Sequence, residues 1–414
     1  MVALCAIAGL SAILSACKEE PPAAGPNASP DVSRYSRVAV TDGGPDAAIG
    51  ALGGALDAGY ARALAPRPFR FPADHGPHPD FRTEWWYFTG NLQAEDGRRF
   101  GFQLTLFRRA LAPAASTTSR ASRFATRQAW MGHFALSDVD AEAEVIERDA
   151  KQINSASSRA GSSGQFHAFE RLERGAAGLA GARAHPFRVW LRDWVVSGGD
   201  DLFPLHLRAA QGDVALELQL GRGKALVLQG ERGLSRKNST PGNASYYYSF
   251  TRLPASGLVR TAEGVFRVTG QAWLDREWSS SALAADQSGW DWFSLHLDDG
   301  RDLMVYRLRD QHGETHPYSA GVLVATDGTS TPLTAEQLSF SPGRTWRSAT
   351  GERYPVLWEL RAGDLQLQVS ALFDAQAHGG RFRYWEGAVQ ARGRDGEAPV
   401  SAQGYLEMTG YPGP

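Results

Sequence analysis

The chain has 414 residues, of which 43 are Lys or Arg and 45 are Asp or Glu, giving a formal net charge of −2. This balance excludes the broad basic surface that nucleic-acid binding requires. The 43% hydrophobic and 21% charged content is typical of a globular protein, and the length predicts two or three domains. The two cysteines, Cys5 and Cys17, lie near the N-terminus, which excludes a disulfide framework or a cysteine metal site in the body of the chain.

The N-terminal segment is typical of a bacterial lipoprotein leader. Residues 2–16 form an apolar run that is shorter than the roughly 20 residues needed to span a bilayer. The run ends in Leu-Ser-Ala-Cys, which resembles a lipobox, although no Lys or Arg precedes it. We therefore expect a signal peptide over residues 1–16 and a lipid anchor on Cys17. The expected location is the bacterial cell envelope, facing the periplasm.

The next segment, residues 17–65, is rich in Pro, Ala and Gly and lacks clusters of aromatic residues. Such a segment cannot bury enough apolar surface to order itself. It predicts a flexible tether between the membrane and a folded body.

The body of the chain alternates between apolar and polar residues, which predicts half-buried antiparallel strands. The alternation is clear over residues 100–106, 214–220 and 365–369. The Asp-Gly pairs at 96–97 and 299–300 supply the positive φ that tight hairpins require. Because no long amphipathic helix is evident, the fold class is mostly β, as sandwiches or barrels.

The body also contains an internal repeat. Residues 85–108 and 290–307 each contain an aromatic-rich strand, an Asp-Gly turn and a second strand ending in Arg. The polar, turn-rich segment 235–245 separates the two copies. These features predict two related halves, 66–240 and 241–414.

Several motifs resemble the AttH-like family, which is related to carotenoid 1,2-hydratase (hydroxyneurosporene synthase). They are TEWWYFTG at 83–90, WLDREW at 273–278, GWDWF at 289–293, YWEG at 384–387 and GYLEMTGY at 404–411. The resemblance implies two tandem lipocalin-like antiparallel β-barrels, over 66–240 and 241–414. Because AttH is associated with an ABC transport system, it also implies a transporter as a partner.

Three functions remain open from the sequence. A small barrel can enclose one apolar ligand, and 12 Trp, 12 Tyr and 19 Phe could line its interior. The first expectation is therefore a lipid-anchored protein that binds or hands over a lipid or isoprenoid. The alternative, implied by the resemblance, is a cofactor-free hydratase-like lyase that adds water to an isoprenoid double bond. The third is a scaffold whose packed barrels bind a protein partner.

The resemblance to the hydratases implies that Asp275 is the proton donor. Protonation of an alkene needs a neutral carboxyl in a dry pocket and aromatic faces for the resulting cation. Trp273, Tyr246 and Tyr248 could supply those faces. Arg276, however, replaces the hydratase His beside the Asp, and an adjacent Arg would lower the pKa of the Asp. The alternative is that Asp275 pairs with an Arg at a strand end.

Other carboxylates lie within aromatic segments, where burial is costly unless they are paired. Glu84 and Glu277 each precede a Trp, Glu386 follows one, and Arg82, Arg108, Arg252 and Arg276 are candidate partners. These Glu residues either form ion pairs that fix barrel closure or anchor a ligand head group.

Four tryptophans, Trp85, Trp86, Trp290 and Trp292, are further candidates for ligand binding. We expect some of these tryptophans to lie in the core and others to line the pocket. Adjacent residues of a strand point to opposite faces, so only one of Trp85 and Trp86 can face the barrel interior.

Metal and cofactor sites have little support in the sequence. His75 and His78 could hold a metal, but the Gly-Pro between them predicts a loop and no further ligands follow. The sequence contains no nucleophile elbow, P-loop or dinucleotide fingerprint. We therefore expect neither a metal nor a cofactor.

Overall fold

The computed structural model describes residues 59–114, 126–141, 164–281 and 283–413. The expected signal peptide, the anchor residue Cys17 and most of the expected tether lie outside the described residues. Strands dominate the described part, as the sequence predicts. Its helical elements are three 3-10 turns: η2 (Ala73–His75), η3 (Ala176–Gly178) and η4 (Ala335–Gln337). Within these ranges, nothing helical has the length and apolarity needed to cross a membrane.

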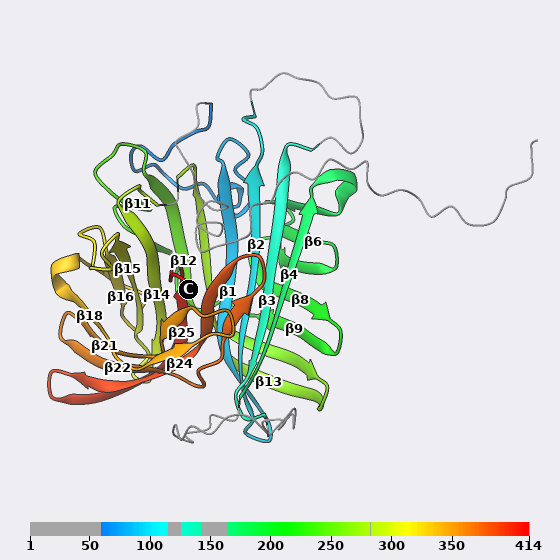
Figure 1. Ribbon diagram of the computed structural model, residues 1–414. Coiled ribbons are helices and arrows are strands. Elements are labelled where there is room, and N and C mark those ends of the chain that lie inside the picture. Colours follow the sequence, from blue (N-terminus) through cyan, green and yellow to red (C-terminus); the bar gives the residue numbers. More distant parts are fainter. Residues whose placement is uncertain (1–58, 115–125, 142–163, 282, 414) are drawn as a thin grey trace, which may run out of the picture. The chain divides into compact units, whose positions relative to one another are not determined.

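The first sheet contains 13 antiparallel strands and curves around its own core (Figure 1). The strand order is β4-β3-β2-β1-β13-β12-β9-β8-β7-β6-β5, with β10 and β11 also paired to β12. The curvature brings β6 back into contact with β2 and β3, which nearly closes a barrel. Its strands are β1 (Thr83–Ala94), β2 (Arg99–Ala110), β3 (Gln128–Asp138), β4 (Gln165–Arg174), β5 (Ala180–Arg183), β6 (Arg188–Leu191), β7 (Trp194–Gly199), β8 (Leu202–Gln211), β9 (Val214–Leu220), β10 (Val227–Leu228), β11 (Leu234–Arg236), β12 (Ala244–Thr261) and β13 (Gly264–Ser279).

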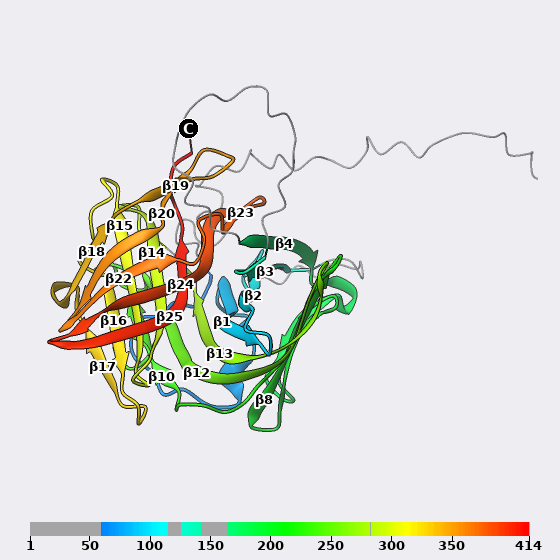
Figure 2. The ribbon, with the colours of Figure 1, turned by 90° about the horizontal axis from the view of Figure 1, so that it is seen from below.

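The second sheet contains ten antiparallel strands and also curls around a core (Figure 2). The order is β17-β16-β15-β14-β25-β24-β22-β21-β18, with β23 paired to β24. Its strands are β14 (Gln287–Leu297), β15 (Asp302–Asp310), β16 (Ala320–Val324), β17 (Ser330–Leu333), β18 (Leu338–Pro342), β21 (Leu357–Ala362), β22 (Leu365–Ala371), β23 (Ala377–Gly379), β24 (Arg383–Asp395) and β25 (Ala398–Met408). A separate hairpin joins β19 (Thr345–Arg347) and β20 (Arg353–Pro355). The two tandem lipocalin-like barrels implied by the resemblance are confirmed.

The change from one barrel to the other lies between Ser279 and Gln287, later than the expected division at 240/241. The reason is strand pairing: β12 pairs with β9, and β13 pairs with β1, so both belong to the first sheet. The end of the expected tether also differs from the prediction. Ala63 is buried in the first barrel's core, and the carbonyl of Ala65 accepts a hydrogen bond from Tyr246.

Period-two alternation explains how each strand contributes to a core. On β9, Val214, Leu216, Leu218 and Leu220 are buried, as their spacing predicts. Gly97 and Gly300, in the two expected Asp-Gly hairpin turns, have φ of 93° and 87°. The described residues form three apolar clusters: one inside each barrel, and a third where outward-facing side chains of the two barrels meet.

The internal repeat lies at this third cluster. The hairpins β1–β2 and β14–β15 carry its two copies, and each pairs along its strand register as the repeat predicts. Tyr87 and Trp292, at equivalent repeat positions, meet edge to face with ring centroids 5.3 Å apart. The repeat thus places two aromatic hairpins against each other between the barrels.

Candidate functional site: a pocket between the barrels

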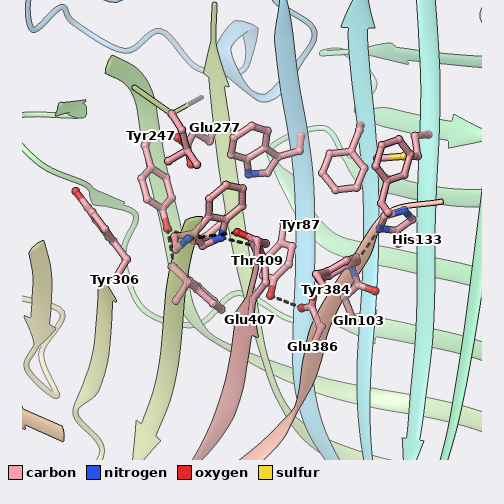
Figure 3. Close-up of a pocket in the computed structure, with 18 of the residues that line it drawn as sticks. Tyr87, Gln103, His133, Tyr247, Glu277, Tyr306, Tyr384, Glu386, Glu407 and Thr409 are labelled. Atoms are coloured by element: carbon pink, nitrogen blue, oxygen red, sulfur yellow. Dashed lines mark hydrogen bonds between the residues drawn. The ribbon is translucent and has the colours of Figure 1, made fainter. Parts of the chain in front are cut away.

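A pocket with a volume of about 110 Å³ lies where the two barrels meet. Its walls come from β1, β2, β3, β12 and β13 on one side and from β14, β15, β24 and β25 on the other (Figure 3). Its aromatic lining residues are Trp85, Tyr87, Phe107, Tyr247, Trp290, Trp292, Tyr306, Phe382 and Tyr384. The expectation of a ligand cavity inside a barrel is wrong for this pocket, because buried side chains of the two barrel cores occupy those interiors.

Strand alternation decides which side chains reach the pocket. On β1, Trp85 lines the pocket, whereas Trp86 belongs to the interior core, as expected for adjacent residues of a strand. On β13, Asp275 and Glu277 line the pocket, whereas Arg276 stacks 3.9 Å from the ring centroid of Trp86. Each strand therefore presents one set of residues to the core and another to the pocket.

Asp275 is buried and is held by three neutral hydrogen-bond donors. The hydroxyls of Tyr247 and Ser249 each donate to it at 2.5 Å, and the indole Nε1 of Trp273 donates at 2.7 Å. Burial raises the pKa of Asp275 to about 7, although these hydrogen bonds oppose the shift. Asp275 is therefore a carboxyl that can be neutral near neutral pH.

Arg276 pairs with Glu84 and not with Asp275, and the pKa of Asp275 is raised, contrary to the sequence expectation. Its guanidinium donates to Glu84 on the interior face of the first barrel, and Arg108 donates to the same carboxylate. Burial alone would raise the pKa of Glu84, but the charges of Arg276 and Arg108 hold it below its ordinary value. Glu84 therefore forms the buried ion pair that the sequence offered as one alternative.

The second barrel contributes two further carboxyls to the pocket. The indole Nε1 of Trp290 donates to Glu407 at 2.7 Å, and burial raises the pKa of Glu407 to about 7. Glu386 is fully buried and accepts a hydrogen bond from Tyr87. Burial, reinforced by the nearby charge of Glu407, raises its pKa well above the ordinary value. Neither carboxyl has an Arg or Lys within ion-pair distance among the described residues.

Glu277 differs from these three acids. Its carboxylate lies 3.3 Å from the ammonium of Lys237 and accepts a hydrogen bond from Ser245. Burial would lower the pKa of Lys237, but the charge of Glu277 raises it. The two residues thus place a buried ion pair at the pocket wall.

The other residues singled out in the sequence are not all brought together. Trp290 and Trp292 line the pocket, and the ring of Trp273 packs 6.1 Å from Trp292. Tyr246 and Tyr248 belong to the interior core, and Tyr248 lies 2.7 Å from Nδ1 of His75. Neither tyrosine can therefore present a face to a ligand beside Asp275.

The two histidines considered for a metal serve other contacts. Beyond its contact with Tyr248, His75 stacks on Phe71. His78 lies 3.1 Å from Asp74 and 3.2 Å from Glu84. In the described ranges, no three His, Cys, Asp or Glu residues form a group that could hold a metal.

Sequence reasoning missed Tyr247 and Glu407 as pocket residues. Alternation carried a signal for Tyr247, because Tyr246 and Tyr248 must share the opposite face of β12. The repeat carried a signal for Glu407. Tyr87 is paired across the sheet with Asp275, and Trp292, its equivalent in the repeat, is paired with Glu407. The two acids are therefore equivalent positions in the two barrels.

Comparison with known proteins agrees with this architecture. The profile of the AttH-like family matches residues 62–161 and 153–411. A crystal structure of a candidate AttH from Nitrosomonas europaea is 35% identical, with a TM-score of 0.70, covering 85% of this chain and 99% of that one. The crystal structure of kievitone hydratase from Nectria haematococca is 14% identical, with a TM-score of 0.61, covering 85% and 95%, and shows the fold alone. No curated protein matches the sequence. On the profile match and the 35% identity, the chain belongs to the AttH-like family.

Proposed function

We propose that the protein is a hydratase-like enzyme that adds water to a carbon–carbon double bond of an apolar ligand, with Asp275 as the proton donor. The observation that carries this proposal is a buried acid with a pKa of about 7 that opens on an aromatic pocket. A general acid is most effective when its pKa lies near the working pH. The acid needs no cofactor to act.

In the proposed reaction, Asp275 supplies the proton and the aromatic lining stabilises the cation that forms. The carboxyl of Asp275 transfers its proton to one alkene carbon, and the π electrons form the new C–H bond. The positive charge left on the other carbon is stabilised by the faces of aromatic residues such as Trp292 and Tyr247. Water adds to that carbon, and the proton it loses returns to the Asp275 carboxylate. Tyr247, Ser249 and Trp273 orient the acid throughout.

The structural likeness to kievitone hydratase supports the same reading, because it places a protein named as a hydratase on this fold. That support is an analogy of fold. In this chain, Asp275 and its surroundings carry the support.

The test is incubation of the purified protein with acyclic carotenoids and shorter isoprenoids, followed by mass spectrometry for products heavier by one water. The wild-type protein is expected to form a hydrate, and Asp275→Asn is expected to form it at least about a hundredfold more slowly while keeping its fold. Asp364→Asn, at an exposed turn between β21 and β22, is the matched control and should retain activity. Equal rates for Asp275→Asn and wild type would overturn the assignment.

A second candidate is binding and transfer of an apolar ligand without turnover, which the aromatic-rich lining favours. This function would leave a lipid or isoprenoid bound to the purified protein and unchanged by it. Mass spectrometry of organic extracts from several preparations tests this. Turnover of the extracted compound by wild type, but not by Asp275→Asn, would decide for the enzyme.

The cell-envelope location is a separate proposal that rests on the sequence around Cys17, outside the described residues. Cys17→Ala is expected to move the protein from the membrane fraction to the soluble fraction and to remove the acyl mass from its N-terminus. Unchanged membrane association of the variant would contradict the anchor. The proposed ABC transporter partner should co-purify with the anchored form.

A further inference from the structure

One end of the pocket is polar and lies apart from the side that carries Tyr247 and Glu277. Figure 3 shows Gln103, Tyr384 and Glu386 close together on one side, with Tyr247, Glu277 and Tyr306 on the other. The polar residues come from β2 and β24, whereas the Asp275 side comes from β12, β13 and β15. The pocket therefore offers two chemically different ends to one ligand.

Two buried polar atoms at this end have no hydrogen-bond partner among the described residues: Oε1 of Gln103 and Oε2 of Glu386. Both side chains are fully buried and line the pocket. The amide nitrogen of Gln103 donates to Thr105 at 2.6 Å and to Tyr384 at 3.3 Å. If the amide were turned round, its nitrogen would be the unpaired atom instead. Either orientation leaves one amide group open to a ligand.

Such unpaired groups are costly unless a ligand completes them. Glu386 accepts from Tyr87 through Oε1, so Oε2 is the oxygen that can carry a proton and donate it to a ligand. With its amide oxygen toward the pocket, Gln103 offers an acceptor beside it. A donor and an acceptor side by side match a hydroxyl group, which accepts one hydrogen bond and donates another.

We propose that Gln103 and Glu386 form a subsite that binds a neutral hydroxyl group of the ligand. The ligand is then an unsaturated apolar alcohol or phenol, with its hydroxyl at this end and its double bond toward Asp275. This inference rests on the proposed function only for the placement of the double bond. A carboxylate head group is disfavoured, because Lys237 is the only Lys or Arg among the described lining residues and it is paired with Glu277.

Neighbouring residues hold the subsite in place. Tyr384 lies 2.6 Å from Nδ1 of His133 and stacks on His378 with ring centroids 4.5 Å apart. Thr105 fixes the amide of Gln103 from the adjacent position on the same face of β2. The subsite is therefore built before a ligand arrives, which reduces the entropy lost on binding.

The test compares the affinities of matched probes by quenching of tryptophan fluorescence at pH 7. The probes are geraniol, the hydrocarbon 2,6-dimethylocta-2,6-diene, geranate, and the farnesol series of the same three forms. Each alcohol is expected to bind about tenfold more tightly than its hydrocarbon, the value of roughly one net hydrogen bond, and more tightly than its carboxylate. Equal affinities for alcohol and hydrocarbon, or no binding of any probe, would overturn the proposal.

Variants assign the preference to the subsite. Gln103→Met removes the amide at similar volume and should reduce the preference for alcohols, whereas Glu386→Gln keeps a donor and should retain it. Gln366→Met, at an exposed position of β22, is the matched control. An unchanged preference in Gln103→Met would overturn the assignment. The same titrations in Asp275→Asn separate the two proposals, because the preference there does not depend on turnover.

Discussion

The two faces of β13 surround buried carboxyls with different partners: cationic on one face and neutral on the other. On the interior face, Arg276 and Arg108 surround Glu84 and keep it ionised. On the pocket face, one residue away along the strand, Asp275 meets only neutral donors, and its pKa rises to about 7. The burial of the two carboxyls is similar, so the difference lies in their partners.

This comparison distinguishes a buried carboxylate that stabilises the fold from a buried carboxyl that can donate a proton to a ligand. A buried carboxylate paired with two guanidiniums holds its neighbours in place and has no proton to give at neutral pH. A buried carboxyl without a cation retains its proton and can donate it to a ligand. Glu407 resembles Asp275 in this respect, with an indole donor and a pKa raised to about 7.

The largest expected effect is on catalysis at the pocket face. Asp275→Asn removes the acidic proton but keeps the size and the hydrogen-bonding shape of the side chain. Turnover of a hydratable substrate should fall by roughly 10²–10⁴-fold, the usual contribution of a general acid. Rate measurements at saturating substrate check this, with circular dichroism to show that the fold is retained. A loss of turnover of less than threefold would contradict a catalytic role for the pocket face.

On the interior face, the large effect should be on stability. Glu84→Gln leaves the guanidiniums of Arg108 and Arg276 buried without their counter-ion. We expect the free energy of unfolding to fall by about 3–5 kcal/mol, the usual cost of breaking a buried pair. Urea denaturation measures it, with Glu359→Gln, an exposed residue of β21, as the control. If Glu84→Gln were as stable as wild type, Glu84 would not stabilise the interior face.

The pH dependence of stability should have opposite signs on the two faces. The folded pKa of Asp275, about 7, lies above its ordinary value of 3.8, so its contribution to stability is complete below pH 4 and is lost as the pH rises through 7. The folded pKa of Glu84 lies below its ordinary value of 4.5, so its contribution is present above that pH and is lost in acid. Denaturation of wild type, Asp275→Asn and Glu84→Gln from pH 2 to 8 checks both, because the Glu84 contribution changes only in acid. Difference curves with the same sign would contradict the comparison.

The smallest effect should come from removing one hydrogen bond to Asp275, which changes its pKa. The hydroxyl of Ser249 stabilises the ionised form of Asp275, so Ser249→Ala should raise its pKa further. The decline of activity at high pH should then shift upward by about one pH unit or less. A pH–rate profile measures the shift. Movement toward lower pH would show that Ser249 does not donate to the carboxylate.

Much of the fold could be predicted from the sequence. Alternation at 214–220 identified a half-buried strand, and the Asp-Gly turns identified the hairpins of the repeat. The boundary near 240 differs from the structure, because the turn-rich segment before Ala244 joins strands of the same sheet. Local composition indicates a turn but does not indicate which sheet the next strand enters.

The site was harder to predict, because its chemistry depends on the face that each residue occupies. Sequence proximity suggested that Arg276 would lower the pKa of Asp275, whereas the pleat of β13 sends the two side chains to opposite faces. The pocket itself forms between outer faces of two barrels, and no periodicity within one strand reveals that contact. The pairing of Trp292 with Glu407 could have been inferred only by applying the repeat to strand pairing as well as to sequence.

The most direct test of the account is the protonation state of Asp275. Infrared difference spectroscopy of wild type against Asp275→Asn, from pH 5 to 9, should show the carbonyl stretch of a protonated carboxyl that disappears with a midpoint near 7. Absence of that band at pH 5 to 6, with the carboxylate bands of Asp275 present throughout, would contradict the account, because an ionised Asp275 could not protonate a double bond.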